Sequence, residues 1–203
     1  MDGALFDWIN GFAGRAHGLD LIMAGLARYS VYLFALYLLL LWLAPGGSLG
    51  ERRKRRLLVL RAGVAGVVSL GLGATIGHFI ARPRPFVARS TAKLLIPHLP
   101  DASFPSDHGT LETALTMELR RAGPLVLPVF GLLTLLTMFA RVFAGVHYPG
   151  DMLGALLVAL AGNALVAFAW PWLEPPALRL VGLWESMAQR LGIESTAPAS
   201  RQK

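Results

Sequence analysis

Long apolar runs alternate with short polar stretches along most of the chain. A helix that crosses a bilayer needs about 20 mostly apolar residues. Four runs qualify as such helices: Leu26–Ala44, Ala62–Ile80, Leu125–Ala140 and Met152–Trp172. The last of them ends on two tryptophans, a residue type that is enriched at membrane–water interfaces. The pattern therefore predicts an all-α, polytopic transmembrane helical bundle.

A shorter apolar run, Gly109–Leu119, carries Glu112 and Glu118. Acidic side chains are costly in lipid unless they face protein or a polar cavity. We therefore expect a central helix that its neighbours screen from lipid, which gives about five spans in all. The stretch Ala4–Met23 mixes bulky apolar residues with charged ones and predicts an N-terminal interfacial helix.

A chain of 203 residues is long enough for one such bundle and too short for two. One integral membrane domain is therefore expected over residues 1–194, including a partly amphipathic stretch at Leu178–Leu191. Residues 195–203 are polar and are expected to form a disordered tail. The first residues carry an acid and no basic start, so no cleavable signal peptide is expected.

Composition agrees with a membrane protein. Charged residues make up 15% of the chain, whereas an ordinary soluble domain has about 25%. The chain has no cysteine, which excludes disulfides, thiolate metal sites and thiol catalysis. The net charge is +7, and a large share of it lies in Glu51–Arg56, directly beside an apolar run. Such a block is typical of a cytoplasmic membrane loop, so no nucleic-acid partner is expected.

Basic residues near the ends of the spans predict the orientation. If all five spans cross, Glu51–Arg56, Arg120-Arg121 and the C-terminal stretch share one side, and this basic side is expected to be cytoplasmic. The opposite side then holds the N-terminus, the loop Arg82–Asp107 and the turn Gly145–Asp151. That outer loop is also basic, which indicates a further role for its cations, Arg82, Arg84, Arg89 and Lys93.

The first of three polar clusters on the outer side follows the second span at Ala81–Phe86. Prolines on both sides of Arg84 end the helix and stiffen the backbone. Guanidinium groups on a stiff turn suit bidentate binding of phosphate oxygens. The alternative for such a repeat at a helix exit is an interfacial anchor.

The second cluster, Phe104–His108, comes directly before the central helix. Ser106 predicts an N-cap, and Asp107 suits the positive end of the helix dipole. Free backbone N–H groups at such a terminus form an anion site. His108 lies in the first turn, where it can donate a proton to a leaving oxygen, or else it is an interfacial residue.

The third cluster runs from Arg141, which closes one span, to Asp151, which opens the next. His147 lies in the turn between them. An aspartate four residues after a histidine can accept its ring N–H and leave the other nitrogen as nucleophile or base, although Asp151 is also a plain N-cap candidate. Together the clusters meet the needs of phosphoryl transfer. No ligand set indicates a metal, so neither a metal nor another cofactor is expected.

These clusters resemble the signature of the type 2 phosphatidic-acid phosphatase superfamily, K-x6-R-P, P-S-G-H and S-R-x5-H-x3-D. The matching stretches are Arg84-Pro85, Pro105–His108 and Ala140–Asp151. Asp107 at the glycine position of the second motif, with the sequence RPRPF before it, is similar to the bacterial undecaprenyl-diphosphatase (bacitracin-resistance) branch. By motif the resemblance covers residues 79–154.

The resemblance implies a metal-independent enzyme of the bacterial plasma membrane that hydrolyses undecaprenyl diphosphate to the monophosphate. Its site would face the outside, with the C-terminus in the cytoplasm. His147 would attack phosphorus and form a phosphohistidine, Asp151 would orient His147, and His108 would protonate the leaving group. The phosphoryl oxygens would be bound by Arg84, Arg141, Ser106 and backbone N–H groups near Asp107.

Two positions depart from the family pattern. The lysine of the first motif falls at Gly77, and the serine before Arg141 is Ala140. Arg82 or His78 is the expected substitute for the missing cation.

Three further polar residues lie outside these motif positions. Glu112 lies one turn below His108 and is expected either to hold that imidazole protonated or to meet an arginine from another helix. His17 and His98 have no partner in the pattern and are expected at the surface.

Other functions stay open at this stage. One keeps the mechanism but changes the lipid to phosphatidic acid, phosphatidylglycerol phosphate or a lipid A phosphate. Another transfers the phosphoryl group to a second lipid rather than to water. A third is a non-enzymatic anion or lipid transporter that uses the same arginines. The expected partners are a polyprenyl diphosphate lipid and the bilayer, and the sequence sets no oligomeric state.

Overall fold

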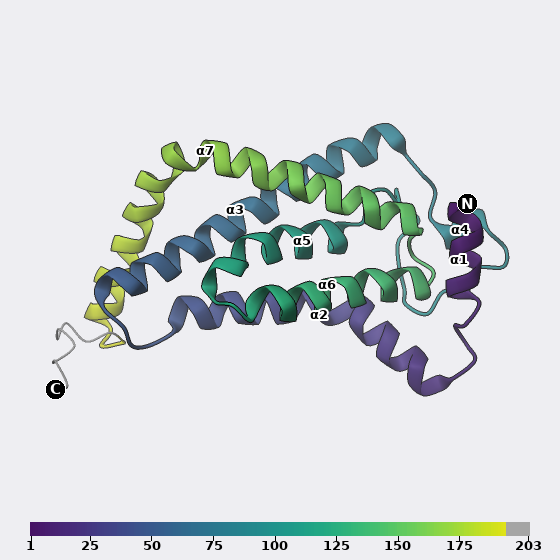
Figure 1. Cartoon of the computed structure of the whole chain (residues 1–203), viewed down its shortest axis with the longest axis horizontal. Coiled ribbons are helices and arrows are strands. Elements are labelled where there is room, and N and C mark those ends of the chain that lie inside the picture. Colours follow the sequence, from purple (N-terminus) through teal and green to yellow (C-terminus); the bar gives the residue numbers. More distant parts are fainter. Residues whose placement is uncertain (194–203) are drawn as a thin grey trace.

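Helices form the architecture of residues 1–193, the part of the chain that the computed structural model describes (Figure 1). The elements are α1 (Asp2–Asn10), α2 (His17–Leu43), α3 (Leu49–Ile80), α4 (Pro85–Ala88), α5 (Asp107–Leu119), the 3-10 turn η1 (Arg120–Ala122), α6 (Val126–Phe143) and α7 (Pro149–Arg190). Within these residues there is no strand, and the predicted all-α bundle is confirmed. The predicted tail, residues 195–203, lies outside the described residues.

Four helices, α2, α3, α6 and α7, are long and apolar enough to cross a membrane. Their outer faces expose rows of large apolar side chains, among them Leu36, Leu40, Leu132, Leu135, Leu157 and Phe168. Apolar surface on this scale is typical of contact with lipid. The chain is therefore a multi-pass membrane protein.

The short helix α5 lies at the centre of the bundle, packed against α2, α3, α6 and α7 (Figure 1). Most of its residues are buried, including Glu112 and Glu118. Glu118 forms ion pairs with Arg61 of α3, at 2.9 Å, and with Arg121 of η1. The prediction of a central helix screened from lipid is confirmed, and its acids face protein.

Two helices begin earlier than the apolar pattern predicts. α2 starts at His17, so the second part of the predicted interfacial stretch belongs to the first span, and only α1 forms a separate short helix. α3 starts at Leu49 and includes Glu51–Arg56, which was predicted as a loop. The cause is a capping box, in which the Ser48 N–H donates to Glu51 (2.6 Å) and the Glu51 N–H donates to the Ser48 hydroxyl (3.2 Å).

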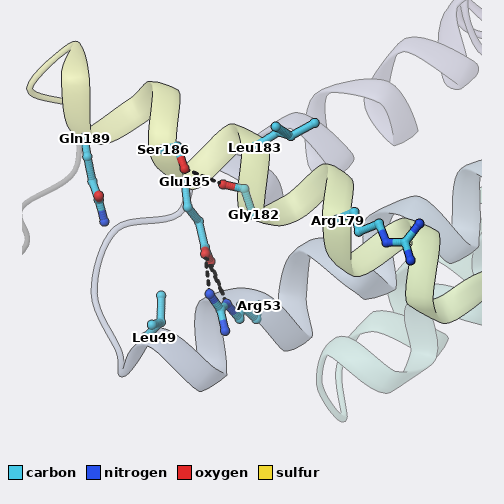
Figure 2. A pocket seen from close by; sticks show the side chains of 8 residues that line it. All are labelled: Leu49, Arg53, Arg179, Gly182, Leu183, Glu185, Ser186 and Gln189. Carbon is cyan, nitrogen blue, oxygen red and sulfur yellow. Dashed lines mark hydrogen bonds and ion pairs between the residues drawn. The ribbon is translucent and has the colours of Figure 1, made fainter.

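The last helix continues well beyond the predicted end at Trp172. α7 has 42 residues and contains Pro171, Pro175 and Pro176, which remove backbone donors and bend helices. Figure 1 shows the bend where the helix turns from green to yellow. The part after the bend packs back on the start of α3, where Arg53 donates to Glu185 at 2.8 Å (Figure 2).

The loops gather at two opposite ends of the bundle. α1, α4, the loop 81–106 and the turn 144–148 lie at one end, on the right of Figure 1. The start of α3, η1 and the end of α7 lie at the other. The start of α3, η1 and the described part of the C-terminal stretch, which were predicted to share one side, therefore share one end, and the three polar clusters share the opposite end.

Small residues allow α3 and α7 to approach closely. A Cβ on Gly162 of α7 would lie 2.9 Å from the Cα of Ser69 on α3, which is closer than side chains pack. A Cβ on Gly73 of α3 would lie 3.8 Å from the side chain of Val158 on α7, and 3.3 Å from the ring of Pro105 in the loop before α5. Close backbone approach through glycine is a common way for membrane helices to associate without a hydrophobic driving force.

We expect Gly162→Ala to destabilise the bundle, because the added methyl meets the backbone of Ser69 and forces α3 and α7 apart. Overpacking of this kind costs about 1–3 kcal/mol. Thermal unfolding of the purified protein in one detergent measures the effect. Gly71→Ala is the matched control, since nothing lies within 4 Å of a Cβ there. Equal unfolding midpoints for the two variants would contradict the prediction.

Candidate active site

The candidate nucleophile, His147, lies in the turn between α6 and α7 and is 1% exposed. The turn depends on Gly145, whose φ of +84° lies in the left-handed region that favours glycine. A Cβ at Gly145 would also run into the carbonyl group of Lys93. The turn is thus packed tightly against the outer loop, and the imidazole faces the inside of this end of the bundle.

Hydrogen-bond chemistry fixes the protonation of this imidazole. The Nδ1 atom of His147 lies 2.8 Å from the carbonyl oxygen of Ser103, which can only accept, so Nδ1 carries the proton. The Nε2 atom lies 3.0 Å from Arg84 and 3.1 Å from Arg141, and guanidinium groups can only donate. Nε2 therefore presents its lone pair. Burial lowers the pKa of His147 well below its usual range, and the charges of Arg141 and Arg84 lower it further.

The two arginines come from different elements and are each 3% exposed. Arg84, at the N-cap of α4, donates to Asp101 (2.7 Å) and to the carbonyl of Val146 (3.0 Å). Arg141, near the end of α6, donates to the carbonyl of Ala27 on α2 (2.9 Å). These bonds fix both guanidinium groups beside Nε2 of the imidazole. Such a fixed pair is suited to binding the oxygens of a phosphoryl group.

Asp151, in the first turn of α7, is fully buried. One of its oxygens accepts hydrogen bonds from the Tyr148 N–H (2.8 Å) and the Ser103 hydroxyl (2.9 Å) and lies 3.5 Å from Nδ1 of His147. The other oxygen pairs with Arg82 at 2.9 Å. Asp151 thus caps its helix and also lies beside the imidazole, while the shortest contact of Nδ1 is with the Ser103 carbonyl.

The second cluster lies against the start of α7, where the Ser106 N–H donates to the Asp151 carbonyl oxygen at 3.3 Å. Ser106 caps α5, since its hydroxyl accepts from the Gly109 N–H at 3.3 Å. Asp107 and His108 lie within electrostatic range of both Arg84 and Arg141. The structure therefore brings the start of α5 to the same place as the candidate nucleophile.

Two residues of this site were not predicted from the sequence to belong to it. Ser103 contacts both His147 and Asp151, and no motif marks it. His98 was predicted at the surface, but its side chain is 21% exposed and its Nε2 lies 3.1 Å from Arg141. Its ring centre lies 6.2 Å from that of His147. The only signal in the sequence that this loop contributes to the site was its basic character. His17, the other histidine predicted at the surface, is exposed as predicted.

The two expected substitutes for the missing lysine, His78 and Arg82, lie in different surroundings. His78 is exposed at the end of α3 with its ring against Phe79. Arg82 forms ion pairs with Asp151 and Asp2, so its guanidinium group binds carboxylates. Position 77 itself has no room, because a Cβ there would lie 2.8 Å from the carbonyl oxygen of Phe104.

Glu112 accepts a hydrogen bond from Ser30 of α2 at 2.5 Å and lies within electrostatic range of Arg141. Its hydrogen-bond partner is thus a serine, which neither prediction named, and both predicted partners stay open. Across residues 1–193, no group of three or more His, Asp or Glu side chains is placed to hold a metal ion.

We expect the ring of His147 to be neutral at pH 6, with its proton on Nδ1, because its pKa is lowered in the folded protein. An unperturbed histidine, with a pKa of about 6.5, is mostly protonated at that pH. Nitrogen NMR of the ¹⁵N-histidine-labelled protein distinguishes the two states, and His147→Gln assigns the signal. A protonated ring at pH 6 would refute this assignment.

Comparison with known proteins agrees with this geometry. The family model described as the PAP2 superfamily matches residues 57–174. The chain is 37% identical to undecaprenyl-diphosphatase BcrC of Bacillus subtilis, over 94% of this chain and 95% of that protein. It is 31% identical to the putative undecaprenyl-diphosphatase YbjG of Escherichia coli, over 82% of this chain and 81% of that protein.

A solved structure shares the fold. The crystal structure of Aquifex aeolicus LpxE superposes with a TM-score of 0.63 and 23% identity, covering 82% of this chain and 94% of LpxE. At this identity the likeness concerns the fold alone. The family match and the relatives lead to one conclusion: this chain belongs to the PAP2 superfamily, the family that its three polar clusters resemble.

Proposed function

We propose that this protein is a membrane lipid phosphatase that hydrolyses undecaprenyl diphosphate to undecaprenyl phosphate and inorganic phosphate. The observation that carries the proposal is the lone pair of His147 Nε2, which faces Arg84 and Arg141 at one end of a membrane bundle. Two relatives that match most of the chain are named for this activity, which favours the diphosphate over other lipids.

The first chemical step is attack of Nε2 on the terminal phosphorus atom. The bond from phosphorus to the bridging oxygen breaks, and the leaving lipid phosphate takes the electron pair. His108 gives its proton to that oxygen. Arg84 and Arg141 bind the phosphoryl oxygens, whose charge they stabilise in the transition state. Backbone N–H groups at the start of α5 add donors beside Asp107.

The second step releases phosphate from the phosphohistidine. Its ring carries a positive charge, which the Ser103 carbonyl at Nδ1 and the nearby carboxylate of Asp151 stabilise. A water molecule gives a proton to His108 and attacks phosphorus. The phosphorus–nitrogen bond breaks, its electron pair returns to Nε2, and inorganic phosphate leaves.

The orientation of the protein in the membrane is assigned from the basic residues at the two ends of the bundle. The end with Glu51–Arg56 and Arg120-Arg121 carries the basic segments and is assigned to the cytoplasm. The candidate site then faces the outside of the bacterial plasma membrane, as one domain over residues 1–194. The diphosphate headgroup would lie at the polar end while the polyprenyl chain follows the apolar outer faces.

Phosphate release from a panel of lipids tests the substrate. We expect kcat/KM for undecaprenyl diphosphate to exceed that for phosphatidic acid, phosphatidylglycerol phosphate and lipid A phosphate by about tenfold or more, since those lipids present a phosphomonoester. One purified preparation serves for every lipid. A glycerolipid preferred by about tenfold would overturn the substrate assignment, and label recovered on a second lipid would indicate phosphoryl transfer instead of hydrolysis.

Trapping the covalent intermediate tests the mechanism. After rapid mixing with terminally labelled lipid diphosphate in chelator, we expect acid-labile label on His147. His147→Ala should lose nearly all turnover while the protein still folds and unfolds cooperatively, because the substitution removes the nucleophile. A folded His147→Ala variant that keeps its activity would favour the transporter, which needs charge but no nucleophile.

A further inference from the structure

The first helix reaches the candidate site through a carboxylate. Asp2, at the start of α1, lies 2.5 Å from Arg82 and accepts a hydrogen bond from the Gly150 N–H at 2.8 Å. Arg82 in turn contacts the buried Asp151 at 2.9 Å. A Cβ on Gly150 would lie 2.9 Å from Asp2, so the glycine at this position makes the approach possible.

Asp151 needs a cation, because it is fully buried and an unpaired buried carboxylate is costly. Arg82 is the cation that contacts it, with its guanidinium carbon 3.8 Å from the centre of the Tyr148 ring. The arginine side chain is 28% exposed, so burial alone does not fix its orientation. Asp151 contacts one terminal nitrogen of the guanidinium group, and Asp2 binds the other. This second contact fixes the orientation of the guanidinium group.

We propose that Asp2 is a positioning residue of the active site, which acts through Arg82 and Asp151 on His147. The proposal rests on the proposed function. Asp2 touches no reacting atom. Its role is to hold Arg82 against Asp151, so that the carboxylate and Ser103 keep the imidazole in the orientation that directs Nε2 at phosphorus. The N-terminal helix is thereby a part of the catalytic unit.

The rest of α1 is anchored independently of Asp2. Phe6 is fully buried against Tyr148, with ring centres 5.4 Å apart. Asn10 donates to the carbonyls of Lys93 and Phe143, both at 2.8 Å. Asp7 forms a second carboxylate–arginine pair, with Arg89. The helix should therefore stay docked when Asp2 changes, and Asp7 offers a matched control on the same helix.

We expect Asp2→Asn to lower kcat on undecaprenyl diphosphate by about tenfold with little change in KM, because a small misplacement of a reacting group slows chemistry more than binding. Asp2→Glu should restore part of the rate. Asp7→Asn removes an equivalent charge pair away from the imidazole and should keep the wild-type kcat. Thermal unfolding midpoints of all variants are measured in the same detergent.

A double-mutant cycle separates positioning from simple docking. If Asp2 acts through Arg82, Asp2→Asn should add no further loss of kcat in an Arg82→Gln background. Additive losses, equal effects of Asp2→Asn and Asp7→Asn, or a midpoint drop that accounts for the lost rate would each overturn the inference. A wild-type protein that releases no phosphate from the diphosphate would instead refute the proposed function, and this inference with it.

Discussion

The candidate site depends on one constraint, that two buried guanidinium groups meet at a single neutral imidazole nitrogen. A buried cation is costly unless its donors are satisfied. The chain provides acceptors for several of these donors: the backbone carbonyl of Val146 and the carboxylate of Asp101 for Arg84, and the backbone carbonyl of Ala27 for Arg141. These partners belong to α2, the outer loop and the turn before α7. The elements at this end must therefore pack together before the arginines can be buried.

The same requirement explains how charge is distributed outward from the site. The neutral His147 lies beside the buried Asp151, which pairs with the half-buried Arg82, which pairs with the more exposed Asp2. Each of these charges is compensated by the next one in the series, and the last, Asp2, is partly exposed to solvent. A membrane bundle cannot leave such charges to lipid. The short helix α1 supplies the last partner in this series, which gives a structural reason for its position over the site.

The sequence predicted what depends on local spacing and on hydrophobic runs. The spans, the screened central helix and the motif residues all have such a signature. The start of α3 at Leu49 was missed because charged residues resemble a loop, although Ser48 and Glu51 carry the capping-box pattern. Ser103 and His98 could not be found, because their contacts arise from tertiary packing. Every residue has a backbone carbonyl, so a hydrogen bond from a histidine ring to that group cannot be recognised from the residue type.

The absence of the first-motif lysine at position 77 is also explained by tertiary packing. The segment around Phe104 inserts between α3 and α7, where Gly77 and Gly154 leave room for its carbonyl and its ring. A lysine at position 77 would push this segment outward. The segment also carries Ser103, whose carbonyl holds Nδ1 of His147. In this chain a lysine side chain at position 77 is thus incompatible with the packing that places the Ser103 carbonyl against Nδ1 of His147, and the guanidinium groups beside that imidazole are those of Arg84 and Arg141.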